Sequence, residues 1–122
     1  MPSFTLSWMI LPAINAGIAS LEYAVEQLGV PLILVMGHSG CGAVSAALSD
    51  QPLSPLQEQL VAPIRACLQP GDDLSRAVRR NACSTAQRLT TGSDLLRQAQ
   101  ASGRVQIASG CFDLATGRME LL

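Results

Sequence analysis

The sequence predicts an α/β protein with a small, mostly parallel sheet that is flanked by helices. The branched apolar run at residues 32–36 is typical of a strand buried on both faces. A segment with helical spacing precedes this run, and a glycine-rich loop and a second helical segment follow it. This alternation is typical of parallel sheets, which bind their ligands at the carboxyl ends of the strands. The loop after residue 36 is therefore the first place to expect a functional site.

Size and composition limit the possible classes of protein. The 122 residues suffice for one domain, and 48% apolar but only 3% aromatic residues indicate an aliphatic core. The net charge of -1 argues against a nucleic-acid partner, and the sequence has no apolar run long enough to span a membrane. The four cysteines do not form a dense disulfide framework, and the N-terminus lacks the basic region of a signal peptide. We therefore expect a cytoplasmic protein with free thiols or metal ligands.

The chain divides into an N-terminal arm over residues 1–10 and a domain over residues 11–122. Residues 4–11 alternate loosely in polarity and end at Pro12, which predicts a strand or an extended arm. From Ala13 the apolar residues fall at helical spacing, and Gly29 follows as a helix stop. A helix therefore leads into the central strand.

Capping signals mark three further helices. Residues 50–55 form a loop that ends in Ser54 and Pro55, a cap followed by proline at the first helical position. After a second break, Asp73 can cap the next helix, and Ser93 can cap a short last helix. We expect the arginines of the middle helix to form a solvated face; they are Arg76, Arg79, Arg80 and Arg88.

The C-terminal part reads as strands. Gly103 ends the last helix, and residues 104–108 alternate as a strand. A turn over 113–117 separates Cys111 and Phe112 from a terminal strand over 118–122, which predicts a hairpin. The expected sheet thus contains the central strand, the strand after it, the hairpin strand and the N-terminal arm.

The glycine loop carries a candidate metal site. His38, the only histidine, and Cys41 lie three residues apart at the end of the central strand. Imidazole and thiolate are the ligands that zinc prefers. The loop residues around them are candidates for an anion or substrate loop; they are Gly37, Ser39, Gly40 and Gly42. This segment supplies two ligands, whereas zinc in proteins takes four.

Several segments together resemble the β-class carbonic anhydrases. The specific ones are Ser-Leu-Glu-Tyr-Ala-Val at 20–25, Leu-Gly-Val at 28–30 and Gly-His-Ser-Gly-Cys-Gly-Ala-Val at 37–44. Residues 77–81, 103–107 and 112–117 also look like the family's later helix and last strands. The resemblance covers about residues 11–122 and implies a shortened β-carbonic anhydrase fold.

The resemblance also implies a site. Enzymes of this family hold zinc with two cysteines and one histidine, and the zinc-bound hydroxide attacks CO2 to give bicarbonate. His38 and Cys41 match the second half of that ligand set. The first half comes from a Cys-x-Asp-x-Arg motif on an earlier strand, which these 122 residues do not contain. Residues 1–9 stand in its place and include no Cys, His, Asp or Glu.

Two functions follow from this departure. The favoured one is a β-carbonic anhydrase-like protein with an incomplete zinc site, weak or inactive in CO2 hydration and retained for assembly or for binding a small anion. The alternative is an active minimal zinc carbonic anhydrase, a lyase whose site is completed by another ligand, by solvent or by a partner subunit. Cys111, which begins a Cys-x-Asp sequence, is the extra ligand to consider. The chain could also be a shortened product of a full-length enzyme.

The absent strand has a structural consequence. Without it, the central strand would have an unpaired apolar edge, which promotes aggregation unless another segment covers it. Residues 4–11, from the same chain or from a partner, could add to that edge. We therefore expect a homodimer or a higher homo-oligomer, with CO2, bicarbonate or another small anion as the small-molecule partner.

Overall fold

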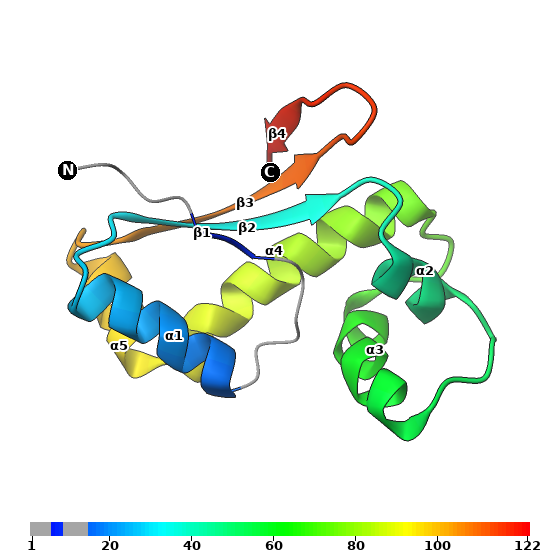
Figure 1. Ribbon diagram of the computed structural model, residues 1–122, viewed down its shortest axis with the longest axis horizontal. Helices are drawn as coiled ribbons and strands as arrows, with labels where there is room; N and C mark the ends of the chain where they lie inside the picture. Colours follow the sequence, from blue (N-terminus) through cyan, green and yellow to red (C-terminus); the bar gives the residue numbers. More distant parts are fainter. Residues whose placement is uncertain (1–5, 9–14) are drawn as a thin grey trace.

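The computed structural model describes residues 6–8 and 15–122. Over these residues the chain forms four strands and five helices (Figure 1). In order they are β1 (Leu6–Trp8), α1 (Asn15–Glu26), β2 (Leu32–His38), α2 (Gly42–Leu48), α3 (Pro55–Cys67), α4 (Leu74–Gly92), α5 (Asp94–Ala101), β3 (Gln106–Phe112) and β4 (Met119–Leu121). None of these helices has both the length and the apolar character needed to cross a membrane. The predicted α/β class is confirmed.

The sheet has the strand order β1-β2-β3-β4. β1 and β3 run parallel to β2, and β4 runs antiparallel to β3. β2 and β3 pair along their full length, from Leu32 opposite Gln106 to His38 opposite Phe112. The sheet is therefore mostly parallel, and the carboxyl ends of β2 and β3 lie side by side.

The N-terminal arm provides the edge strand beside β2. Leu6 pairs with Ile33 and Trp8 pairs with Val35, both in parallel register. The prediction that the arm covers this edge of the central strand is thus confirmed for residues 6–8. The rest of the arm, residues 1–5 and 9–10, lies outside the described residues, so the domain boundary at residue 10 stays a prediction.

The helices lie on one side of the sheet (Figure 1), and the buried side chains form two clusters, one between the sheet and the helices and one among α2, α3 and α4. The sheet cluster consists of Val25, Ile33, Val35, Ala82, Leu89, Leu96, Ala99 and Val105. The helix cluster consists of Cys41, Val44, Ala47, Val61, Ile64, Ala77 and Val78. α4 contributes to both clusters, so the burial of its apolar face joins the two halves of the molecule.

Local sequence signals place the helix starts. The Ser54 hydroxyl accepts a hydrogen bond from the Gln57 backbone N–H at 3.2 Å, and the Gln57 side chain accepts one from the Ser54 N–H at 2.9 Å. This reciprocal pair is a capping box, with Pro55 at the start of α3. Asp73 caps α4 through the backbone N–H three residues on, and Ser93 caps α5 in the same way. All three predicted caps are confirmed.

Two strands are longer than the sequence pattern predicted. β2 continues to His38 and β3 continues to Phe112, because the two strands stay paired where Gly37 lies opposite Cys111. The loop that was predicted to begin at Gly37 therefore begins at Ser39. The glycine at position 37 wrongly indicated a loop, because this residue lies within β2 and packs closely against α4.

The predicted solvated arginine face is only partly solvated, because Arg76 is exposed whereas the other three arginines are half-buried. Arg79 forms an ion pair with Glu120 of β4, and Arg80 forms one with Asp72 at 2.7 Å. The hydrogen bond from Arg80 lowers the pKa of the Asp72 carboxyl, whose side chain is only 4% exposed. Arg88 is half-buried as well. Helical spacing placed these arginines away from the apolar face but could not reveal the acidic partners that reach them.

Candidate functional site

The predicted site lies where β2 ends and α2 begins. β2 is buried over residues 33–35, and its last residue is His38. Gly40 adopts a φ of 68°, a left-handed conformation that favours glycine, and turns the chain towards α2. Cys41 occupies the N-cap position of α2 in an extended conformation. A strand end and a helix start together fix the His-x-x-Cys segment.

Gly37 allows α4 to pack closely against the end of β2. A Cβ atom built on Gly37 would lie 2.8 Å from Val78 Cγ1 and 3.3 Å from the Val78 carbonyl oxygen. It would also lie 3.6 Å from Ala82 Cβ. Any side chain at this position would therefore push α4 away from β2, next to the candidate ligand His38.

His38 is half-buried, and its ring is oriented by the neighbouring backbone. Its Nδ1 atom lies 2.9 Å from the Ser39 carbonyl oxygen. A carbonyl oxygen can only accept, so Nδ1–H is the donor, which leaves Nε2 as the unprotonated nitrogen of the neutral ring. A histidine ligand with one nitrogen held by a carbonyl and the other presented to a metal is the usual arrangement in zinc sites. Nε2 of His38 is thus the atom suited to bind a metal.

Cys41 is the most buried of the four cysteines. Its exposed fraction is 4%, and it packs within the helix cluster beside Val44 and Ala47. Its side chain makes no capping hydrogen bond to α2. The Cys41 thiol therefore lies at the start of α2, with its sulfur not used to cap the helix.

Ser39 connects the candidate metal loop to the β3–β4 hairpin, a role that the sequence analysis missed. Its backbone N–H donates to the Phe112 carbonyl at 2.9 Å, and its hydroxyl accepts from the Leu114 N–H at 2.9 Å. The partners are more than 70 residues away in sequence, so no local pattern could have indicated these bonds. They hold the loop against the turn over residues 113–117.

Cys111 lies directly opposite Gly37 in the β2–β3 pairing. It packs against the helix cluster, and Gly37 also faces α4. Because side chains alternate along a strand, His38 and Phe112 project from the opposite face of the sheet. The structure therefore does not bring Cys111 together with His38, and a ligand role for Cys111 stays a prediction.

The chemistry of the two candidate ligands fits zinc, but their number does not. Imidazole nitrogen and thiolate sulfur are typical zinc donors. Within residues 6–8 and 15–122, no three His, Cys, Asp or Glu side chains are grouped so that they could hold a metal ion. Zinc takes four ligands, so His38 and Cys41 stay candidate ligands and would account for two of the donors that such a site needs.

Comparison with known proteins identifies the family. The family model described as Carbonic anhydrase matches residues 9–119, which is nearly the whole chain. The chain belongs to the carbonic anhydrase family. A protein named "Carbonic anhydrase" from Mycolicibacterium smegmatis is 34% identical over 116 residues, covering 88% of this chain and 56% of the relative. The chain therefore spans about half the length of the curated relatives that it matches.

Solved structures place the chain in the β class. A β-carbonic anhydrase from Aspergillus fumigatus has 26% sequence identity and a TM-score of 0.77, with 93% of this chain and 59% of that chain covered. A tetrameric β-carbonic anhydrase from Sordaria macrospora has 24% identity and a TM-score of 0.74, covering 93% of this chain and 63% of that one. The second similarity shows the fold alone. The predicted shortened β-carbonic anhydrase fold is confirmed.

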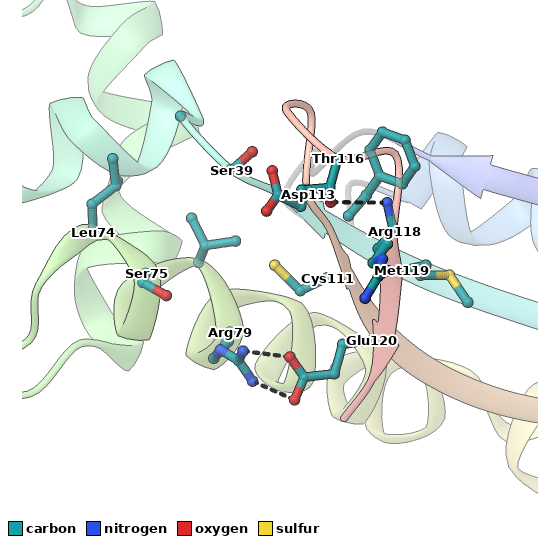
Figure 2. A pocket seen from close by; sticks show the side chains of 13 residues that line it. Ser39, Leu74, Ser75, Arg79, Cys111, Asp113, Thr116, Arg118, Met119 and Glu120 are labelled. Carbon is teal, nitrogen blue, oxygen red and sulfur yellow. Dashed lines mark hydrogen bonds and ion pairs between the residues drawn. The ribbon is translucent and has the colours of Figure 1, made fainter.

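A pocket lies beside the candidate metal loop, between α4 and the β3–β4 hairpin (Figure 2). Its volume is about 710 Å³. Ser39 and Gly40 of the loop contribute to its lining, whereas His38 and Cys41 do not. The other lining residues come from α4 and from the chain between Cys111 and Glu120. The pocket is thus a neighbour of the candidate metal centre and is separate from the two candidate ligands.

Proposed function

We propose that this chain is a β-carbonic anhydrase-like protein that contributes His38 and Cys41 to a zinc site. With these 122 residues alone, we expect it to hydrate CO2 weakly or not at all. The observation that carries the proposal is the donor count. Within residues 6–8 and 15–122, no three His, Cys, Asp or Glu side chains are grouped so that they could hold a metal ion, and the His-x-x-Cys segment supplies two donors of the zinc type. A two-ligand site binds zinc more weakly than the usual protein site and orients it poorly.

A second candidate is an active zinc carbonic anhydrase whose site is completed by another ligand, by solvent or by a partner subunit. The orientation of the His38 ring supports this candidate. The hydrogen bond from Nδ1–H to the Ser39 carbonyl oxygen leaves Nε2 available to bind a metal. In either case we propose that CO2, bicarbonate or another small anion binds at the segment from the end of β2 to the start of α2, at Gly37, Ser39, Gly40 and Gly42.

Zinc content and activity together distinguish the two candidates. The chain is purified without added metal or chelator, zinc per chain is measured by elemental analysis, and CO2 hydration is followed by stopped flow. We expect zinc well below one per chain and a rate close to the uncatalysed one. Cys41→Ser should lower the residual zinc, whereas Cys67→Ser should not, because the Cys67 thiol instead donates to the Ile64 carbonyl at 3.0 Å.

Stoichiometric zinc that is lost in Cys41→Ser and kept in Cys67→Ser would contradict the incomplete site. If CO2 hydration then also disappeared in His38→Ala, the second candidate would replace the first. Zinc retained in both His38→Ala and Cys41→Ser would remove these two residues from the site altogether.

We further propose that the chain is a cytoplasmic homodimer or higher homo-oligomer. Several large apolar side chains are exposed; among them are Leu56 at 76%, Leu121 at 66% and Tyr23 at 61%. Association would remove this surface from water. The relative from Sordaria macrospora is described as tetrameric, which supports assembly in this family. Sedimentation at micromolar concentration should give more than the 12.8 kDa of one chain, and a monomer mass would contradict the proposal.

A further inference from the structure

The pocket beside the metal loop contains a thiol. Cys111 is the member of the four cysteines that lines it. Figure 2 shows the Cys111 sulfur pointing into the space between Ser75, Arg79 and Asp113. The residue is half-buried, so a small molecule that enters the pocket can reach the sulfur.

The other cysteines are placed differently. Cys41 is buried within the helix cluster, and the Cys67 thiol donates to a backbone carbonyl. Cys83 lies with its sulfur 3.5 Å from the Ser109 hydroxyl, beneath β3. None of these three lines the pocket. Since a thiol reacts only where it is accessible, the four cysteines should differ in reactivity.

One pair of opposite charges near Cys111, Arg79 and Glu120, is already joined by hydrogen bonds. Arg79 makes two hydrogen bonds to the Glu120 carboxylate, at 3.2 and 2.5 Å. These bonds are the main reason that the pKa of Arg79 is raised, with a smaller contribution from the nearby thiols of Cys111 and Cys83. Arg79 therefore lies close to Cys111 but is largely neutralised by Glu120.

Two further charges at the pocket are not paired with each other. Asp113 and Arg118 stand at the two ends of the hairpin turn, where the Asp113 N–H donates to the Arg118 carbonyl at 2.8 Å. No ion pair joins their side chains in the part of the chain that the structure describes, although both line the pocket. One Asp113 oxygen, Oδ1, accepts a hydrogen bond from the Ala115 N–H at 2.9 Å. One side of the pocket thus offers the remaining carboxylate oxygen and a guanidinium for a ligand that carries both signs of charge.

The pocket also has the size and the apolar surface of a small-molecule site. Its volume of about 710 Å³ lies within the usual range for such sites, about 300–1,000 Å³. Among its lining residues, Leu74 and Val78 of α4 supply apolar side chains. A thiol, two opposite charges and an apolar wall together define the chemistry of a ligand.

We propose that Cys111 is a thiol–disulfide exchange site for small disulfides built from amino acids, with Arg118 receiving a carboxylate and Asp113 an ammonium group of the incoming molecule. The Cys111 thiolate attacks one sulfur of the disulfide, the S–S bond breaks, and the other half leaves as a thiolate that takes a proton from water. Cys111 is oxidised to a mixed disulfide, and the leaving half is reduced to a thiol. The step uses neither zinc nor His38 and Cys41, so it does not depend on the proposed function.

Oxidised glutathione, which carries carboxylate and ammonium groups, tests the site. The full chain is incubated with it, and mixed disulfides are followed by intact mass and located by peptide mapping. We expect Cys111 to react at least about tenfold faster than each other cysteine, and Cys111→Ser to lose the fast phase. Fast modification of Cys67 or Cys83, or equal rates at all four cysteines, would overturn the proposal.

Charge recognition is tested with a neutral disulfide as the matched reagent. Arg118→Ala and Asp113→Asn should each slow the reaction with oxidised glutathione about twofold to fivefold, the range of an exposed ionic contact. Neither variant should change the rate with bis(2-hydroxyethyl) disulfide. Arg104→Ala, an exposed arginine at the other end of β3, is the control and should change neither rate. Equal slowing with both reagents, or no slowing with oxidised glutathione, would refute the assigned roles.

Discussion

Replacing Gly37 by alanine tests the contact that places α4 against the end of β2. The new Cβ atom would lie 2.8 Å from Val78 Cγ1, whereas carbon atoms pack best at about 3.5–4.0 Å. Val78 cannot easily turn away, because a valine in a helix strongly prefers one rotamer and this one is 1% exposed. The contact of 3.3 Å with the Val78 carbonyl oxygen involves the helix backbone itself. Either α4 shifts or the contact stays strained.

Overpacking of this kind costs about 1–3 kcal/mol. The backbone at Gly37 does not have a positive φ, so alanine adds no backbone strain there. The smaller conformational freedom of alanine in the unfolded chain offsets about 0.4–1 kcal/mol of the cost. We therefore expect Gly37→Ala to lower the free energy of unfolding by about 1–2 kcal/mol. Urea unfolding followed by circular dichroism should show a midpoint lower by about 0.5–1 M, for an m value near 2 kcal/mol/M.

Two further variants make this prediction specific. Gly42→Ala is the matched control, because a Cβ at Gly42 meets no atom within 4 Å and the residue lies in α2. It should leave stability unchanged or raise it by up to about 1 kcal/mol. In the double variant Gly37→Ala/Val78→Ala the clash with Cγ1 is absent, so the two changes should cost about 0.5–2 kcal/mol less than their sum. Additive costs, or a Gly37→Ala chain as stable as the wild type, would refute the reasoning.

Three other predictions concern single contacts. The pKa of Glu120 is lowered from 4.5, chiefly by its hydrogen bonds from Arg79. The stability that this ion pair contributes is therefore fully present above pH 4.5 and is lost as the pH falls through the lowered pKa. Glu120→Gln should therefore be less stable than the wild type near neutral pH and equally stable in acid, as measured by urea unfolding across pH; a constant difference would contradict this. Leu96→Ala, at a fully buried position, should cost about 2–5 kcal/mol, whereas Leu114→Ala, at a 64% exposed position, should stay within about 0.5 kcal/mol in the same assay. Ser54→Ala should lose the capping box and about 0.5–2 kcal/mol, and a thermal midpoint equal to the wild type would count against that contribution.

Parts of the fold could be read from the sequence because they depend on neighbours in the chain. A cap such as Asp73 bonds to a backbone N–H three residues away, and a glycine such as Gly103 ends a helix through its own positive φ of 78°. The buried strand at 32–36 and the spacing of His38 and Cys41 are equally local. These features are set by interactions within about one turn of chain, so the residue pattern contains them.

The arrangement of the candidate site needed the tertiary structure. The sequence places His38 and Cys41 on one loop, but only the fold shows that Cys111 lies on the helical face of β3, opposite Gly37. The anchoring of Ser39 on the β3–β4 hairpin likewise joins distant residues. A zinc site depends on how many donors converge at one point, and convergence is a property of packing between segments.

The sequence by itself determined the class, the family and the helix caps, and it named two candidate ligands of the zinc type. Only the tertiary structure decided that β1 covers the edge beside β2, that a side chain at Gly37 would meet Val78, and that Arg79 pairs with Glu120, 41 residues away. The physical reason is the range of the interactions involved. Capping and periodicity act over a few residues, whereas strand register, close approach of a helix and ion pairing between elements depend on how the whole core packs.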